Sequence, residues 1–268
     1  TDRLINLSSR AKVGLGDSVL ITGFVVGGPA NTKILIRAVG PALSPFGLTD
    51  TLPNPAIKIY QGNQLIAEND DWNKNDAAEM ARLGAFPLTS RNRDADGKDA
   101  ALFITLAPGA YTMQVAEVAG EGVALAEIYD ASSGAFSRTA PRLVNVSART
   151  QVGVGDSILI AGFAIGGSTP VRLLIRAVGP TLSALGVPAV LADPQLELND
   201  ATGVVANNDN WDASLAPVIA SAGAFPLPTG SKDSALVATL SAGRNYTVRI
   251  SGVNNTVGEA LIEVYELP

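Results

Sequence analysis

The chain has 268 residues, of which 47% are hydrophobic and 16% are charged, so it holds enough apolar material for one large or two ordinary packed domains. It contains no cysteine and no histidine, which excludes disulfides, thiolate zinc sites, histidine-liganded metals and Ser-His-Asp catalysis. The net charge of −6 without a basic run argues against nucleic-acid binding, and no apolar run is long enough for a membrane helix.

An internal repeat organises the chain. The segment RLINLSSRAKVGLGDSVLITGFVVGG, which starts at Arg3, returns as RLVNVSARTQVGVGDSILIAGFAIGG from Arg142. The repeat predicts two domains, 1–132 and 142–268, joined by a small and polar linker at 133–141 that ends in proline. Because the chain opens at a repeat boundary, we expect either a mature form or a segment of a longer exported protein.

Within the first copy, short β-rich runs alternate with clusters of Gly, Pro, Asn and Asp, which is typical of strands and turns. The predicted strands are Leu4–Ser8, Ser18–Val26, Lys33–Val39, Ala56–Gln61, Gln64–Asn69, Ala100–Leu106, Gly109–Val118 and Val123–Asp130. This pattern predicts an all-β chain of two tandem homologous β-sandwich domains, jelly-roll-like, each with one short helix.

Two of these runs, DSVLITGFVV and KILIRAV, are too continuously apolar for half-exposed strands. They predict central strands that are buried on both faces, and Gly23 within the first run indicates a bulge or a close backbone approach. Asn73–Phe86, which has Asp and Asn caps and many alanines, predicts the short helix. Its counterpart in the second copy carries Pro217 in the first turn, where proline is tolerated.

The next motif, ENDDWN from Glu68 to Asn73, returns as NNDNWD from Asn207 to Asp212. Calcium binds carboxylate, amide and backbone oxygens, so each copy is a candidate calcium site. The candidate ligands are Asn69, Asp70, Asp71 and Asp99 in the first copy and Asn208, Asp209, Asn210 and Asp233 in the second. The alternative is an ordinary turn in which Asn and Asp bond their own backbone.

Each of these motifs contains a tryptophan, Trp72 or Trp211, and these are the two tryptophans of the chain. An exposed indole ring offers a platform on which a sugar face stacks, so both are candidates for ligand stacking. The alternative is that each ring packs against its turn. The five tyrosines lie in predicted strands and are expected to fill cores or sheet faces.

Two arginines, Arg37 and Arg176, sit inside apolar strands, and a buried arginine requires a partner. Asp17 and Asp156 are plausible partners, in a structural ion pair rather than a ligand site. These two aspartates belong to the tripeptide GDS, which resembles the nucleophile block of GDSL-type esterases. Those enzymes need a histidine base that this chain lacks, so a tight turn into the following strand is the favoured interpretation.

The stretch GNQLIAENDDWN, followed by DAALFITLAPGAYTMQVAEVAGEGVALAEIYD, resembles the bacterial pre-peptidase C-terminal β-sandwich domains. The second copy keeps VVANNDNWD and LSAGRNYTVRISG. The whole unit is also similar to repeats near the C-termini of large exported bacterial proteins. The resemblance implies an extracellular, non-catalytic module, often with calcium in the Asp/Asn turn. Asp71 becomes Asn210 in the second copy, so we expect unequal metal affinity.

These observations predict a secreted or cell-surface module, not an enzyme, with a structural or adhesive role through protein–protein contacts. It is expected to join a larger array or filament, with calcium stabilising its turns. The alternative is a carbohydrate-binding accessory module of an exported enzyme, which an exposed tryptophan ring would support. The first strand of each copy is expected to pair either within its own domain or with a neighbouring subunit.

Overall fold

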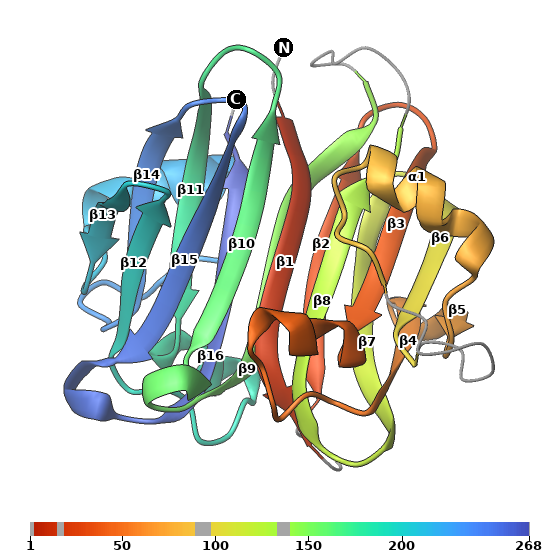
Figure 1. The fold of residues 1–268 in the computed structure, drawn as a ribbon. Coiled ribbons are helices and arrows are strands. Elements are labelled where there is room, and N and C mark those ends of the chain that lie inside the picture. The colour runs from red at the N-terminus through yellow and green to blue at the C-terminus, as the bar shows by residue number, and fades with distance from the viewer. Residues whose placement is uncertain (1–2, 15–18, 89–97, 133–139, 268) are drawn as a thin grey trace. The chain divides into compact units, whose positions relative to one another are not determined.

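The computed structural model describes residues 3–14, 19–88, 98–132 and 140–267. The chain divides into two compact units, which are treated separately below (Figure 1). The N-terminal unit comprises Asn6–Ala135 and Thr139–Leu143, and the C-terminal unit comprises Thr1–Ile5, Phe136–Arg138 and Val144–Pro268. The predicted linker lies mostly outside the described residues.

The N-terminal unit is a two-layer β-sandwich. One sheet has the order β1–β8–β3–β6 and the other β2–β7–β4–β5, and every printed pair within them is antiparallel, which is the strand order of a jelly roll. Its elements are β1 (Arg3–Val13), β2 (Leu20–Gly27), β3 (Thr32–Val39), a 3₁₀ helix (Pro41–Phe46), β4 (Asn54–Gln61), β5 (Gln64–Asn69), a 3₁₀ turn (Lys74–Asp76), α1 (Ala77–Arg82), β6 (Ala100–Leu106), β7 (Gly109–Ala119) and β8 (Gly122–Asp130).

The C-terminal unit repeats this architecture, with sheets β9–β16–β11–β14 and β10–β15–β12–β13. Its elements are β9 (Arg142–Val152), a 3₁₀ turn (Gly155–Ser157), β10 (Leu159–Gly166), β11 (Val171–Val178), a 3₁₀ helix (Pro180–Leu185), β12 (Pro194–Asp200), β13 (Gly203–Asn208), a 3₁₀ turn (Ala213–Leu215), α2 (Ala216–Ser221), β14 (Ser234–Leu240), β15 (Arg244–Gly252), a 3₁₀ turn (Val253–Asn255) and β16 (Gly258–Glu266).

The apolar runs differ in how they are buried. From Ile34 to Val39, β3 is buried on both faces, as the sequence predicts. Along β2 buried and half-buried residues alternate, so the prediction of burial on both faces is wrong for that strand. Its register with β7 is regular through the pair Gly23 and Thr112, so the predicted bulge at Gly23 is wrong as well.

The second face of β3 is covered by helical segments. Met80 of α1 and Leu43 of the 3₁₀ helix belong to one buried cluster with Leu35 and Val39 of β3. Figure 1 shows α1 lying over β3 and β6. In the C-terminal unit Ile219 of α2 belongs to the corresponding buried cluster. This cover explains why a strand of a two-layer sandwich contains no exposed face.

Other sequence predictions have mixed outcomes. All eight strands predicted for the first copy are present, but the helix is shorter than Asn73–Phe86. β1 pairs with β8 and β9 pairs with β16, so the first strand of each copy pairs within its own unit, as the first of the two alternatives predicts. No described helix is long and apolar enough to cross a membrane.

Candidate functional site

The asparagine of each Asp/Asn turn links two strands. Asn69 Oδ1 accepts a hydrogen bond from the Ala101 amide at 2.9 Å, and Asn69 Nδ2 donates to the Asp71 carbonyl at 3.0 Å. Asn208 does the same with Ala235 and Asn210. Both side chains are therefore held by protein groups, one in the same turn and one on a strand distant in sequence.

The later aspartate of each candidate set binds a different part of the unit. Asp99 is fully buried, and its Oδ1 accepts from the amides of Gly40 at 2.7 Å and Ala42 at 3.3 Å, at the start of the 3₁₀ helix Pro41–Phe46. Asp233 binds the amides of Gly179 and Thr181 in the same way. These carboxylates therefore cap helical turns, because free N–H groups at a helix start attract an anion.

The remaining candidate ligands, Asp70, Asp71, Asp209 and Asn210, are exposed to solvent. Asp71 lies 3.8 Å from the Lys98 ammonium group. Among the residues that the structure describes, no three acidic side chains gather into a group able to hold a metal ion. Calcium binding at either turn therefore stays a prediction, to which these hydrogen bonds add no support.

The two tryptophan rings differ in exposure. Trp211 is 8% exposed, and its Nε1 donates to the Pro228 carbonyl at 3.2 Å and to Ser231 Oγ at 3.1 Å, which counts against the stacking role predicted for this ring. Trp72 is half-buried and packs against the cluster that contains Met80, and its stacking role stays a prediction.

The buried arginines pair across their sheet. Arg37 Nε lies 2.8 Å from Glu127 Oε2, its register partner on β8, and Arg37 Nη1 donates to the Phe86 carbonyl at 2.8 Å. Tyr129 donates its hydroxyl to the other Glu127 oxygen. Burial raises the pKa of Glu127, and the neighbouring guanidinium opposes this rise. The structural ion pair is confirmed in the first copy, with a different partner from the one the sequence suggested.

The second copy contains the same cluster. Arg176 donates through Nε and Nη2 to Glu263, Tyr265 donates to the other carboxylate oxygen, and Arg176 Nη1 donates to the Phe225 carbonyl. Asp17 and the side chain of Asp156, the partners suggested by the sequence, lie outside the described part of the chain. In the second copy GDS forms the 3₁₀ turn Gly155–Ser157, as the tight-turn interpretation predicts; in the first copy Gly16–Ser18 is not described.

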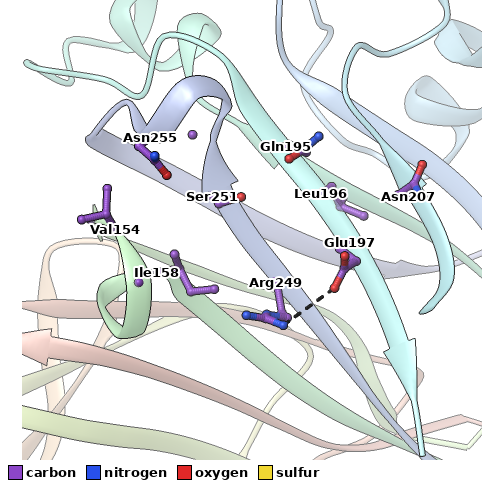
Figure 2. A pocket seen from close by; sticks show the side chains of 12 residues that line it. Val154, Ile158, Gln195, Leu196, Glu197, Asn207, Arg249, Ser251 and Asn255 are labelled. Carbon is purple, nitrogen blue, oxygen red and sulfur yellow. Dashed lines mark ion pairs between the residues drawn. The ribbon is translucent and has the colours of Figure 1, made fainter. Parts of the chain in front are cut away.

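A polar cleft lies on the outer face of the sheet β10–β15–β12–β13 in the C-terminal unit. It has a volume of about 420 Å³. Its polar side chains come from β12 (Gln195 and Glu197), β13 (Asn207), β15 (Arg249 and Ser251) and the turn after β15 (Asn255). Val154 and Ile158 supply apolar surface from the loop before β10 (Figure 2).

The strand register explains why these side chains meet. Glu197 is paired with Asn207 on one side and with Arg249 on the other, and Gln195 is paired with Ser251. Because side chains in register point to the same face of a sheet, they form two adjacent polar rows. Figure 2 shows Glu197 and Arg249 directed toward each other, and their charged atoms lie 3.9 Å apart.

Asn255, which lines the cleft, belongs to the turn Val253–Asn255, which has an unusual backbone. Asn254 and Asn255 have φ values of 55° and 59°, in the left-handed region that asparagine tolerates better than most residues. Such conformations concentrate at binding sites, where a loop must direct a side chain toward a ligand. The first copy has no NN dipeptide in the corresponding segment AEVAGEGV.

The cleft is not evident from the sequence. Its polar residues alternate with buried Leu196, Leu198, Val248 and Ile250, which is the pattern of any half-exposed strand. The signal that was present is the difference between copies. At the matching register the N-terminal unit has Lys58 with Glu68 and Gln114, and Ala56 with Ala116.

Comparison with known proteins adds no family. No protein-family model matches the chain, and no curated protein matches it. Among solved structures, it is similar to the tandem CBM51 modules of a family 98 glycoside hydrolase from Streptococcus pneumoniae, with 9% identity over 92% of this chain and 83% of that one and a TM-score of 0.27. A DUF4785 family protein from Legionella pneumophila gives 11% identity over 100% and 84%, with a TM-score of 0.24. TM-scores this low support no inference about function, and the resemblance to pre-peptidase C-terminal domains stays a prediction.

Proposed function

We propose that the chain is a non-catalytic binding module whose C-terminal unit binds an oligosaccharide in the polar cleft. The observation that carries the proposal is the convergence of six polar side chains, from three adjacent strands and one turn, on a single cleft of about 420 Å³. Sheet positions are rigid, and a rigid set of hydrogen-bonding groups loses little entropy when a ligand binds.

The donors and acceptors of the cleft suit a polyhydroxylated ligand. Arg249 only donates hydrogen bonds, the Glu197 carboxylate only accepts them, and the amides of Gln195, Asn207 and Asn255 do both. Each sugar hydroxyl is both a donor and an acceptor, so neighbouring hydroxyls can be satisfied by this mixed lining. A hydrophobic ligand would leave these polar groups without partners, at a cost in free energy.

The apolar part of the lining sets the expected affinity. Val154 and Ile158 offer aliphatic contact for the C–H face of a sugar, and the lining contains no aromatic ring. Without a stacking platform the ligand gains less than it would on a tyrosine or tryptophan. We therefore expect weak binding, with a Kd of about 0.1–1 mM.

The lining also favours binding over hydrolysis. Glycoside hydrolysis ordinarily requires two carboxyl groups on either side of the scissile bond. Among the lining side chains that the structure describes, Glu197 is the one carboxylate. A single carboxylate leaves the second catalytic group of this reaction without a candidate in the described lining.

The proposal is tested by titrating the chain with a panel of oligosaccharides and measuring heat or NMR shifts. Asn207→Ala removes one amide from the cleft, and we expect it to weaken binding by about three- to tenfold. Glu68→Ala changes the matching position of the N-terminal unit and serves as the control. The proposal fails if no oligosaccharide binds, or if the two variants have the same effect.

The edge strand β13 supports a second candidate function, contact with other proteins. Among described strands it pairs with β12 alone, and its sequence GVVANN carries no charge. Val204 and Val205 are 56% and 45% exposed. Charged residues on an edge normally prevent pairing with another chain, so an uncharged edge with two exposed valines favours strand addition.

This second function is tested by light scattering across a concentration series. Val204→Lys introduces a charge on the β13 edge, and we expect it to abolish any large species that the wild-type chain forms. Leu65→Lys places the same charge on the β5 edge, which already contains Glu68, and is the matched control. A wild-type chain that stays monomeric at every concentration would exclude the self-assembling form of this function.

A further inference from the structure

The Glu197–Arg249 pair gives the cleft a balanced charge. Its charged atoms lie 3.9 Å apart, and the two side chains are 39% and 54% exposed, so a ligand can reach both. Among the described side chains that line the cleft, these two are the only charged ones. The following inference rests on the proposed function, because it concerns which oligosaccharide the cleft accepts.

A neutral sugar can bind both members of the pair without separating them. One hydroxyl accepts from the guanidinium and a neighbouring hydroxyl donates to the carboxylate, so each charge gains a hydrogen bond and keeps its partner. An anionic sugar also attracts Arg249, but it places a like charge beside Glu197. At separations of about 4 Å, such repulsion amounts to about 1 kcal/mol in water and more where solvent is displaced.

We propose that the Glu197–Arg249 pair makes the cleft selective for uncharged oligosaccharides, and that Glu197 is the residue that rejects uronic acids and other anionic sugars. Arg249 is then a donor to neutral hydroxyls rather than a carboxylate receptor. At the matching register of the N-terminal unit, Lys58 lies between Glu68 and Gln114, so the cation and the carboxylate there occupy other strands than in the cleft.

Matched ligands test the inference directly. We would measure binding of β-1,4-mannohexaose against hexamannuronate, and of cellohexaose against its C6-oxidised form, at low ionic strength where charge effects are least screened. The wild-type chain is expected to bind the neutral member of each pair at least about fivefold more tightly, which is the factor that 1 kcal/mol gives. Glu197→Gln is expected to bring the two members within about twofold, by strengthening binding of the acid.

A control variant separates the local effect from net charge. Glu259→Gln removes one negative charge from the same unit, at an ion pair with Arg149 outside the cleft lining, and is expected to leave the preference unchanged. A thermal unfolding curve checks that both variants are folded. If the acid binds the wild-type chain as tightly as the neutral ligand, or if Glu259→Gln changes the preference as much as Glu197→Gln does, the inference is wrong while the proposed function stands. If neither ligand type binds, both are wrong.

Discussion

The two units share one fold, but their corresponding buried aspartates, Asp99 and Asp233, have different hydrogen-bond partners. Asp233 Oδ2 accepts hydrogen bonds from the hydroxyls of Thr181 and Ser231. Asp99 has Ala42 where the C-terminal unit has Thr181, and no donor among the described residues reaches its Oδ2. A buried oxygen without a donor costs free energy, so the same carboxylate is better satisfied in the second copy.

The units differ again on the outer face of the second sheet. The buried Arg–Glu–Tyr cluster is the same in both, whereas the exposed register positions carry Ala56 and Ala116 in one unit and Gln195 and Ser251 in the other. The Arg–Glu–Tyr cluster is therefore repeated in full. The outer face of the second sheet is not, and the cleft lies on this face in the C-terminal unit.

The largest expected effect on stability concerns the buried Arg–Glu pair that both units contain. Arg176→Leu leaves Glu263 buried without its partner, and we expect a loss of about 3–5 kcal/mol in the free energy of unfolding, measured by urea denaturation. Arg37→Leu is expected to cost a similar amount. The double variant Arg176→Leu with Glu263→Leu should recover much of the loss, because no unpaired charge then remains. A single variant that unfolds like the wild type would show that the pair has no structural role.

A smaller effect tests the difference at the aspartate. Thr181→Ala removes a hydroxyl donor from Asp233, and we expect a loss of about 1–3 kcal/mol. Ala42→Thr supplies the corresponding hydroxyl to Asp99, and a gain of about 0.5–1.5 kcal/mol is expected. Chemical denaturation measures the free energy of unfolding of both variants. Destabilisation by both would mean that the space around Asp99 cannot accept the hydroxyl.

The pH dependence of stability gives a further test at Asp99. Burial raises the pKa of Asp99 above its ordinary value of 3.8, against the opposing effect of the Gly40 and Ala42 amides. A raised pKa in the folded state means that the stabilising contribution of this group is complete below pH 3.8 and is lost as pH rises through the raised value. Asp99→Asn removes the charge and keeps an oxygen for both amides. We therefore expect this variant to be at least as stable as the wild type at pH 7, with no advantage near pH 3.

Asp233→Asn is the matched control for this experiment. Its new amide group would face the hydroxyls of Thr181 and Ser231, which now donate to the carboxylate. The variant is therefore expected to be less stable than the wild type at pH 7. The Tm of both variants is measured at the two pH values. If Asp99→Asn and Asp233→Asn change the Tm equally, the two aspartates do not differ in the way proposed.

Much of the fold could be predicted from the sequence, because strand positions follow from local patterns. All eight strands of the first copy are found from apolar runs and turn residues, and Tyr111 and Tyr246 fill the core as expected. The double burial assigned to β2 was wrong, because an apolar run does not reveal which strand the helical segments cover. That cover depends on α1 packing on β3, a contact distant in sequence.

The site could be predicted only in part, for the same reason. The sequence showed that Arg37 needed a partner, but Glu127 becomes its neighbour only through the register of β3 and β8. The repeated pairs Glu127–Tyr129 and Glu263–Tyr265, two residues apart on a strand, were the available signal. Asp99 was grouped with its nearest motif, whereas its amide donor Gly40 comes from another part of the chain.

The smallest expected effect concerns calcium, and it again compares the copies. The Asn69 and Asn208 oxygens already accept backbone amides, and the Oδ1 atoms of Asp99 and Asp233 bind helical turns. An ion would have to displace these donors or bind the few oxygens that remain, so we expect millimolar calcium to shift the Tm by less than about 1 °C. If a larger shift appears, Asp71→Asn decides its origin. This variant gives the first turn the residue found at Asn210, and it should abolish the shift only if the ion binds the first copy more tightly, as its additional carboxylate predicts.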